Sequence, residues 1–157
     1  MDPRHLLIDT VVHIPPPRAL EGLEAADAER RLPGVRHSIA EILAHMSFWQ
    51  DWWCIRCEGT ATPMVATAAA GWPAVEAGSW VLLHQQFTTG LERTAALGGS
   101  NPDRAVMPAI EFPPLAQYSV RDAQMHVAQH NAHHLGQIVL LRQMMGKWPP
   151  PAGSWTW

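Results

Sequence analysis

Apolar side chains recur every three or four residues in three long stretches of the chain, and this period is typical of amphipathic helices. The stretches cover residues 38–58, residues from 74 or 75 to 97, and residues 119–145. A glycine directly follows each of them, as expected where a helix ends. The first and the last stretch open with a serine that is followed three residues later by an acidic residue, which is the pattern of a capping box.

The N-terminal part of the chain has shorter helical signals. Residues 3–13 could form a short helix that consecutive prolines end, and residues 18–31 have helical composition interrupted by a glycine. Residues 100–118 are rich in proline and are expected to form an irregular connection. Because no alternating strand pattern is present, the three long segments and a fourth, shorter helical segment from the N-terminal part predict an all-α protein, a four-helix bundle. We expect a single domain over residues 1–157, in which residues 146–157 form a tail rich in proline and tryptophan.

Composition and charge narrow the class of protein. With 157 residues, of which 47% are hydrophobic, the chain suits one folded domain. A net charge of −3 and only 16% charged residues argue against a basic nucleic-acid binder or a polybasic membrane-surface protein. No apolar run reaches the roughly 20 residues of a membrane-spanning helix, and the N-terminus does not read as a signal peptide. Two cysteines without an export signal fit a reducing cytoplasm, so we expect a cytoplasmic protein without nucleic-acid or membrane partners.

Histidines lie on the apolar face of the last predicted helix. Five apolar residues form the core stripe of this helix: Val120, Val127, Ile138, Leu141 and Met145. At 100° per residue, His134 lies about 20° from the centre of the stripe and His130 about 60° from it. Burying an imidazole costs free energy unless its ring nitrogens have partners, so two imidazoles on one buried face need partners for their nitrogens, and one partner could serve both. A metal ion is the simplest one, because histidines at i and i+4 can point one nitrogen each at the same ion.

His45 can complete this metal site. It lies at the edge of the apolar stripe of the helix predicted over residues 38–58, and it meets His130 and His134 if the two helices are neighbours. Three protein ligands leave coordination positions for water or substrate, as in a catalytic rather than a closed structural site. Glu41 lies one turn before His45 and could accept its second N–H, but capping of the helix is the favoured role. The alternative to a metal is a hydrogen-bonded network of core histidines.

Cys54 and Cys57 form a C-x-x-C pair that we expect to be packing residues. Cys54 is about 13–14 Å from His45 along a straight helix, and on its opposite side. A redox-active pair sits at a helix N-terminus, where the dipole lowers the thiol pKa, whereas these two thiols lie near a helix end.

The helix over residues 38–58 also carries three tryptophans, Trp49, Trp52 and Trp53, which cannot all face one core. A dimer interface is the expected use of at least one of them, and lining of a substrate pocket is the second. His84 lies on the apolar stripe of the next helix, where we expect a core histidine with satisfied hydrogen bonds.

Two of these segments resemble a known family. Residues 126–142 (HVAQHNAHHLGQIVLLR) resemble the last-helix signature of the DinB/YfiT-like superfamily, and residues 38–45 (SIAEILAH) resemble its second helix. The resemblance implies a four-helix bundle with up-down-down-up topology, often as a homodimer. It also implies a divalent metal ion, zinc or nickel in several members, on three histidines that correspond to His45, His130 and His134. Gln137 corresponds to a Gly-Gln step that looks like helix packing.

The resemblance further implies an activity of a metal-dependent kind. Some members are transferases or isomerases that use a low-molecular-weight thiol, and others are described as metal-dependent hydrolases. We therefore expect a metal-dependent enzyme of the thiol-transferase or hydrolase type that acts on a small-molecule substrate, with His126 or His133 as a general base. The alternative is a non-catalytic helical binding protein that a metal stabilises, with His84 or His126 as a fourth ligand; a metal-free interaction domain is a third interpretation.

Overall fold

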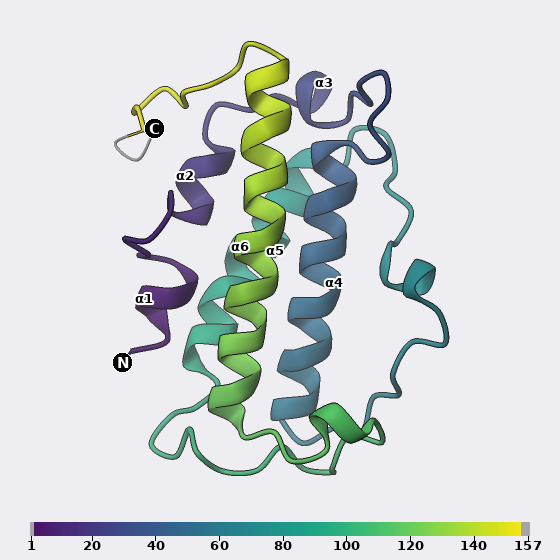
Figure 1. Cartoon of the computed structure of the whole chain (residues 1–157), viewed down its shortest axis with the longest axis vertical. Helices are drawn as coiled ribbons and strands as arrows, with labels where there is room; N and C mark the ends of the chain where they lie inside the picture. Colours follow the sequence, from purple (N-terminus) through teal and green to yellow (C-terminus); the bar gives the residue numbers. More distant parts are fainter. Residues whose placement is uncertain (1, 155–157) are drawn as a thin grey trace.

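The computed structural model describes residues 2–154, and over these residues the chain is helical and contains no β-strand. Three long helices dominate the fold (Figure 1). The elements in chain order are α1 (Arg4–Leu7), α2 (Pro16–Leu20), α3 (Ala25–Ala28), α4 (Ile39–Cys57), η1 (Ala68–Gly71), α5 (Trp80–Ala96), η2 (Pro113–Leu115) and α6 (Val120–Met144). None of the described helices is both long and apolar enough to cross a bilayer.

Capping boxes begin the two helices that carry the candidate ligands, as the sequence predicts. At the start of α4, the Ser38 hydroxyl accepts from the Glu41 backbone N–H, and the Glu41 carboxylate accepts from the Ser38 N–H. Ser119 and Asp122 form the same reciprocal pair at the start of α6. In each box, side chains accept from backbone N–H groups that have no partner inside the first turn. The boxes therefore fix the residue at which each helix begins.

The long helices are arranged so that α6 runs antiparallel to both α4 and α5. Gln50 contacts Phe87 and Cys54 contacts Thr94, so α4 and α5 advance in the same direction. Along α6 the order reverses, because Trp53 lies against His126 whereas His45 lies against His134, further along that helix.

The expected four-helix bundle is not confirmed, because the described N-terminal region holds three short helices in place of one long one. The α1 helix packs against α5 and α6, α2 against α6, and α3 against α4 and α5, as Figure 1 shows for α1 and α2 beside α6. Prolines before and inside α2 lack the N–H that a longer helix would need. Gly22 then turns the chain with a φ of 72°, which separates α2 from α3.

The α5 helix begins five or six residues later than its apolar pattern predicts. Gly78 has a φ of 79°, which no helical residue adopts, so the helix cannot extend back to residue 75. The start of α5 is held instead by Glu29, whose carboxylate accepts from the backbone N–H groups of Gly78 and Trp80. This capping residue lies about fifty positions earlier in the chain, where local sequence gives no sign of it.

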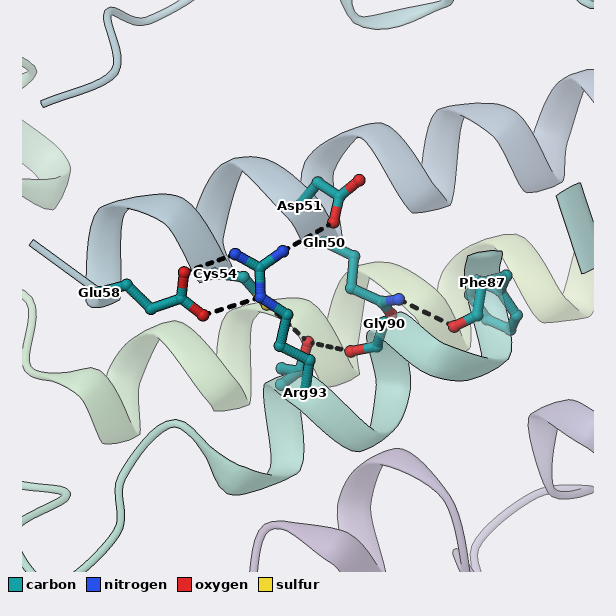
Figure 2. Close-up of polar contacts among 8 residues, drawn as sticks. Gln50, Asp51, Cys54, Glu58, Phe87, Gly90 and Arg93 are labelled. Atoms are coloured by element: carbon teal, nitrogen blue, oxygen red, sulfur yellow. Dashed lines mark hydrogen bonds and ion pairs between the residues drawn. The ribbon is translucent and has the colours of Figure 1, made fainter. Parts of the chain in front are cut away.

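Polar side chains connect α4 to α5 inside the core (Figure 2). Gln50 is 1% exposed, and its Nε2 donates to the Phe87 carbonyl oxygen at 3.0 Å. On the surface, Arg93 of α5 donates to the carboxylates of Asp51 on α4 and of Glu58, the residue that follows α4. Because these contacts link facing turns of the two helices, they hold α4 in register beside α5.

Both cysteines are buried free thiols, which supports their packing role. Cys54 Sγ lies 3.3 Å from Thr94 Oγ1, and burial raises the pKa of the Cys57 thiol to about 12. The described part of the tail packs on the first helices, where Arg18 donates to the Ala152 carbonyl oxygen. Trp155 and Trp157 of the predicted tail lie outside the described residues.

Candidate metal centre

Three histidines from two helices meet at one point in the structure. His45 of α4 and the pair His130 and His134 of α6 each offer a ring nitrogen, and these atoms all lie within 4.8 Å of one another. Nε2 of His130 and Nε2 of His45 are 3.1 Å apart. The antiparallel packing of α4 on α6 brings His45 opposite the i, i+4 pair, so the structure brings together the three residues that the sequence predicts.

Burial keeps these imidazoles neutral. His45 and His134 are only 7% and 6% exposed, and His130 is half-buried. Loss of hydration lowers the pKa of all three, and for His130 the pKa falls to about 3, with the neighbouring His134 and His45 adding to the effect. A neutral imidazole is the form that ligates a metal, so the site is in a binding-competent protonation state at neutral pH.

Hydrogen bonds on the far side of two rings orient their Nε2 atoms. His45 Nδ1 donates to the Gly71 carbonyl oxygen at 2.6 Å, and His134 Nδ1 donates to Oε1 of Gln137 at 2.8 Å. Because both acceptors are oxygens without a proton, each Nδ1 carries the hydrogen and each Nε2 keeps a free lone pair. This is the arrangement found around metal-ligating histidines, where an outer acceptor fixes the tautomer.

The role expected for Gln137 is therefore wrong. Its side chain is exposed and contributes little to helix packing; it connects His134 to His133 instead, since its Nε2 lies 3.3 Å from Nε2 of His133. A glutamine one turn from a buried histidine on the same helix face could have suggested this contact. Glu41 remains a capping residue, as predicted, and its carboxylate also pairs with Arg31 rather than with His45.

The segment that contains Gly71 and Trp72, between α4 and α5, contacts the site. Trp72 stacks between two histidines, 3.8 Å from the His45 ring and 3.9 Å from the His37 ring. Gly71 must lack a side chain, because a Cβ there would lie 2.9 Å from Nε1 of Trp49. The sequence predicts a loop over residues 60–73 but no role for Gly71 or Trp72 at the site; an isolated tryptophan among small residues is a local signal of that role.

The other candidate histidines occupy different places. His126 is half-buried, with its ring 5.1 Å from that of Trp53, and burial lowers its pKa. His133 is exposed on α6. His84 lies against Trp80, and its buried Nε2 has no hydrogen-bond partner, so the expectation of a satisfied core histidine is wrong. Neither His84 nor His126 belongs to the three-histidine group found among the described residues.

A cavity of about 220 Å³ adjoins the histidines. All three tryptophans of α4 line it, so the structure supports the second of their two expected uses, the lining of a pocket. His126 and His130 are its polar members. The complete lining is Trp49, Trp52, Trp53, Met64, Phe112, Leu115, His126, Val127 and His130.

Comparison with known proteins identifies the family. No curated protein and no solved structure matches the chain. The family model of the DinB superfamily matches residues 17–138, which is more than half of the chain and includes all three histidines of the candidate site. The chain therefore belongs to the DinB superfamily.

Proposed function

We propose that the chain is a divalent-metal-dependent enzyme of the thiol-transferase or hydrolase type, with a small-molecule substrate and an ion held by His45, His130 and His134. One observation carries the proposal: the three ring nitrogens converge, and the far nitrogens of two rings are bound to oxygen acceptors. A hydrogen bond between Nε2 of His130 and Nε2 of His45 would explain one of these approaches without a metal, but it does not explain why His134 joins them. Three imidazoles suit zinc or nickel, and these are the ions we propose.

The number of ligands favours catalysis over a purely structural role. Within the described part of the chain, the group contains three members and no fourth histidine, cysteine or carboxylate. Structural zinc sites are closed by four protein ligands, whereas catalytic sites keep a position open. When bound, a divalent ion would supply Lewis acidity toward a water, a thiol or a substrate oxygen.

The neighbouring histidines have separate roles in this proposal. His126 lines the cavity beside His130, and its neutral imidazole can accept a proton from a water or a thiol, so we assign it the role of general base. His133 does not line the cavity, and its ring contacts Gln137, which in turn holds His134. We assign His133 a positioning role through Gln137.

The test is turnover by the metal-loaded protein. Two reactions cover the two types: consumption of a low-molecular-weight thiol by an electrophilic aryl halide, and hydrolysis of nitrophenyl esters. We expect one of them to be lost after chelation, to return with zinc or nickel, and to fall by about 10²–10⁴-fold in His126→Gln at unchanged metal content. If neither reaction responds to metal while a chelator lowers the melting temperature, the non-catalytic, metal-stabilised alternative is correct.

A homodimer is part of the proposal. The outer face of α6 exposes Leu140 and Met144, which are 56% and 55% exposed and would be buried by a second copy of the chain. Light scattering on the purified protein measures the mass directly, and a monomer mass at micromolar concentration would contradict the dimer.

A further inference from the structure

We propose that the cavity lined by the three tryptophans binds a neutral, apolar, ring-sized group of the substrate and holds it beside the histidine cluster. This inference deepens the proposed function and rests on it for the position of the reacting atoms. It concerns the class of substrate, which the three histidines themselves do not determine.

The lining selects against charge. Seven of the nine lining residues are apolar or aromatic, and the other two are His126 and His130; no aspartate, glutamate, lysine or arginine lines the cavity in the described chain. The Trp52 indole N–H is already used, since Nε1 donates to the Pro63 carbonyl oxygen at 3.0 Å. An ionic group placed here would lose its hydration without gaining an ion pair, which is unfavourable.

Its volume suits a single ring. An apolar cavity of about 150 Å³ is enough to hold benzene. A cavity of about 220 Å³ therefore has room for a six-membered ring with a small substituent. The substituent could extend toward His130, which belongs both to the cavity wall and to the histidine cluster.

The walls are held in place before any ligand arrives. The Trp49 ring packs against Gly71, the residue whose carbonyl oxygen also orients His45. The Trp53 ring stacks on Tyr118 at 5.6 Å and meets Trp52 edge-on at 4.9 Å. A preformed apolar pocket binds without the entropy cost of ordering its side chains, which favours ligand binding. Phe112 is 44% exposed and marks the side of the cavity that is open to solvent.

Among the described residues, the cation recorded over one of these tryptophans is Arg56, and carbonyl oxygens accept from two of its three nitrogens. The Arg56 guanidinium lies 6.0 Å from the Trp52 ring, but it is only 4% exposed and donates to the carbonyl oxygens of Thr62 and Pro108. It does not line the cavity. An anionic substrate group would therefore have no counter-charge in the cavity wall. A neutral ligand and an anionic ligand of the same size should thus differ in affinity.

The experiment measures binding of benzyl alcohol and of benzoate by calorimetry. Benzyl alcohol is titrated into the full-length protein as purified and again after dialysis against EDTA, and benzoate into the dialysed protein, because a carboxylate can also ligate a metal. We expect saturable binding of benzyl alcohol in both preparations and at least ten-fold weaker binding of benzoate. Leu115→Trp, which fills the cavity from the loop side, should abolish binding of benzyl alcohol.

Controls separate this inference from the proposed function. Leu82→Trp adds the same side chain at a site that is 56% exposed and lies outside the cavity, and it should leave binding unchanged. Met64→Trp fills the cavity from a second loop and replaces Leu115→Trp if that variant does not fold. Absence of saturable binding, equal binding of benzoate, or unchanged binding in the cavity-filling variants would overturn the inference. Because binding is measured without metal, a failed metal site would leave this result unaffected.

Discussion

Replacing Gly90 by alanine is expected to destabilise the fold, although the same change inside a helix ordinarily stabilises. Gly90 lies in the interior of α5, where alanine would contribute about 1 kcal/mol of helix propensity. A Cβ at this position would overlap Nε2 of Gln50 and come within 3.2 Å of its Cδ. Gln50 must therefore leave the place that it occupies between α4 and α5 in Figure 2.

The size of the effect follows from the hydrogen bonds that Gln50 makes. Its Nε2 donates to the Phe87 carbonyl oxygen at 3.0 Å, and its Oε1 accepts from Nδ2 of Asn131 at 3.2 Å. Displacement leaves two buried donors without partners, at about 1–3 kcal/mol each. After subtraction of the propensity gain of about 1 kcal/mol, the free energy of unfolding should fall by about 1–5 kcal/mol.

Gly136→Ala is the matched control, because Gly136 is an exposed glycine in the interior of α6 and a Cβ there has no neighbour within 4 Å. It should raise the free energy of unfolding by up to about 1 kcal/mol. Both variants and the parent are compared by urea unfolding in EDTA, followed by circular dichroism. Gly90→Ala with the stability of the parent, or above it, would refute the packing described between α4 and α5.

Two further perturbations test the second layer of the site and the core. Gln137→Leu should weaken metal affinity about 10–100-fold while the fold is retained, because His134 loses the acceptor of its Nδ1 hydrogen. Gln143→Leu, on the exposed face of α6, should leave the affinity unchanged. Equal affinities of the two variants in a competition titration with a chromophoric chelator would contradict this. Cys54 and Cys57 should not react with a thiol reagent at pH 8 in the native protein, because burial raises the pKa of Cys57 to about 12 and that of Cys54 above its usual value. Both thiols should react in urea, and rapid labelling of the native protein would contradict their burial.

The three candidate ligands were predictable because helical periodicity is local. His130 and His134 are one turn apart, so their shared face follows from 3.6 residues per turn without knowledge of the rest of the fold. His45 could be added because the core stripe of its own helix shows which side faces the bundle. The contacts of Gly71 and Trp72 could not be predicted this way, since they depend on where a loop of irregular backbone crosses the bundle.

The start of α5 and the lengths of the N-terminal helices were predicted wrongly, because they depend on distant residues or on residues that interrupt a helix. The start of α5 is set by Glu29 and by the positive φ of Gly78, and neither is visible in the apolar pattern of the helix itself. In the N-terminal region the composition favours a helix, but prolines and Gly22 interrupt it, so only short helices form. Short helices are stable there because they pack on the long ones, which is a tertiary effect.

The most direct test of the account is the metal content of the chain. Parent, His134→Ala and His5→Ala are purified without a metal-affinity column and analysed for each metal as moles per mole of chain; His5 is an exposed histidine outside the three-histidine group. The account predicts close to one equivalent of zinc, nickel or another divalent ion in the parent and in His5→Ala, and almost none in folded His134→Ala. Equal metal in the parent and His134→Ala, or none in the parent after metal is offered back, would contradict the three-histidine site.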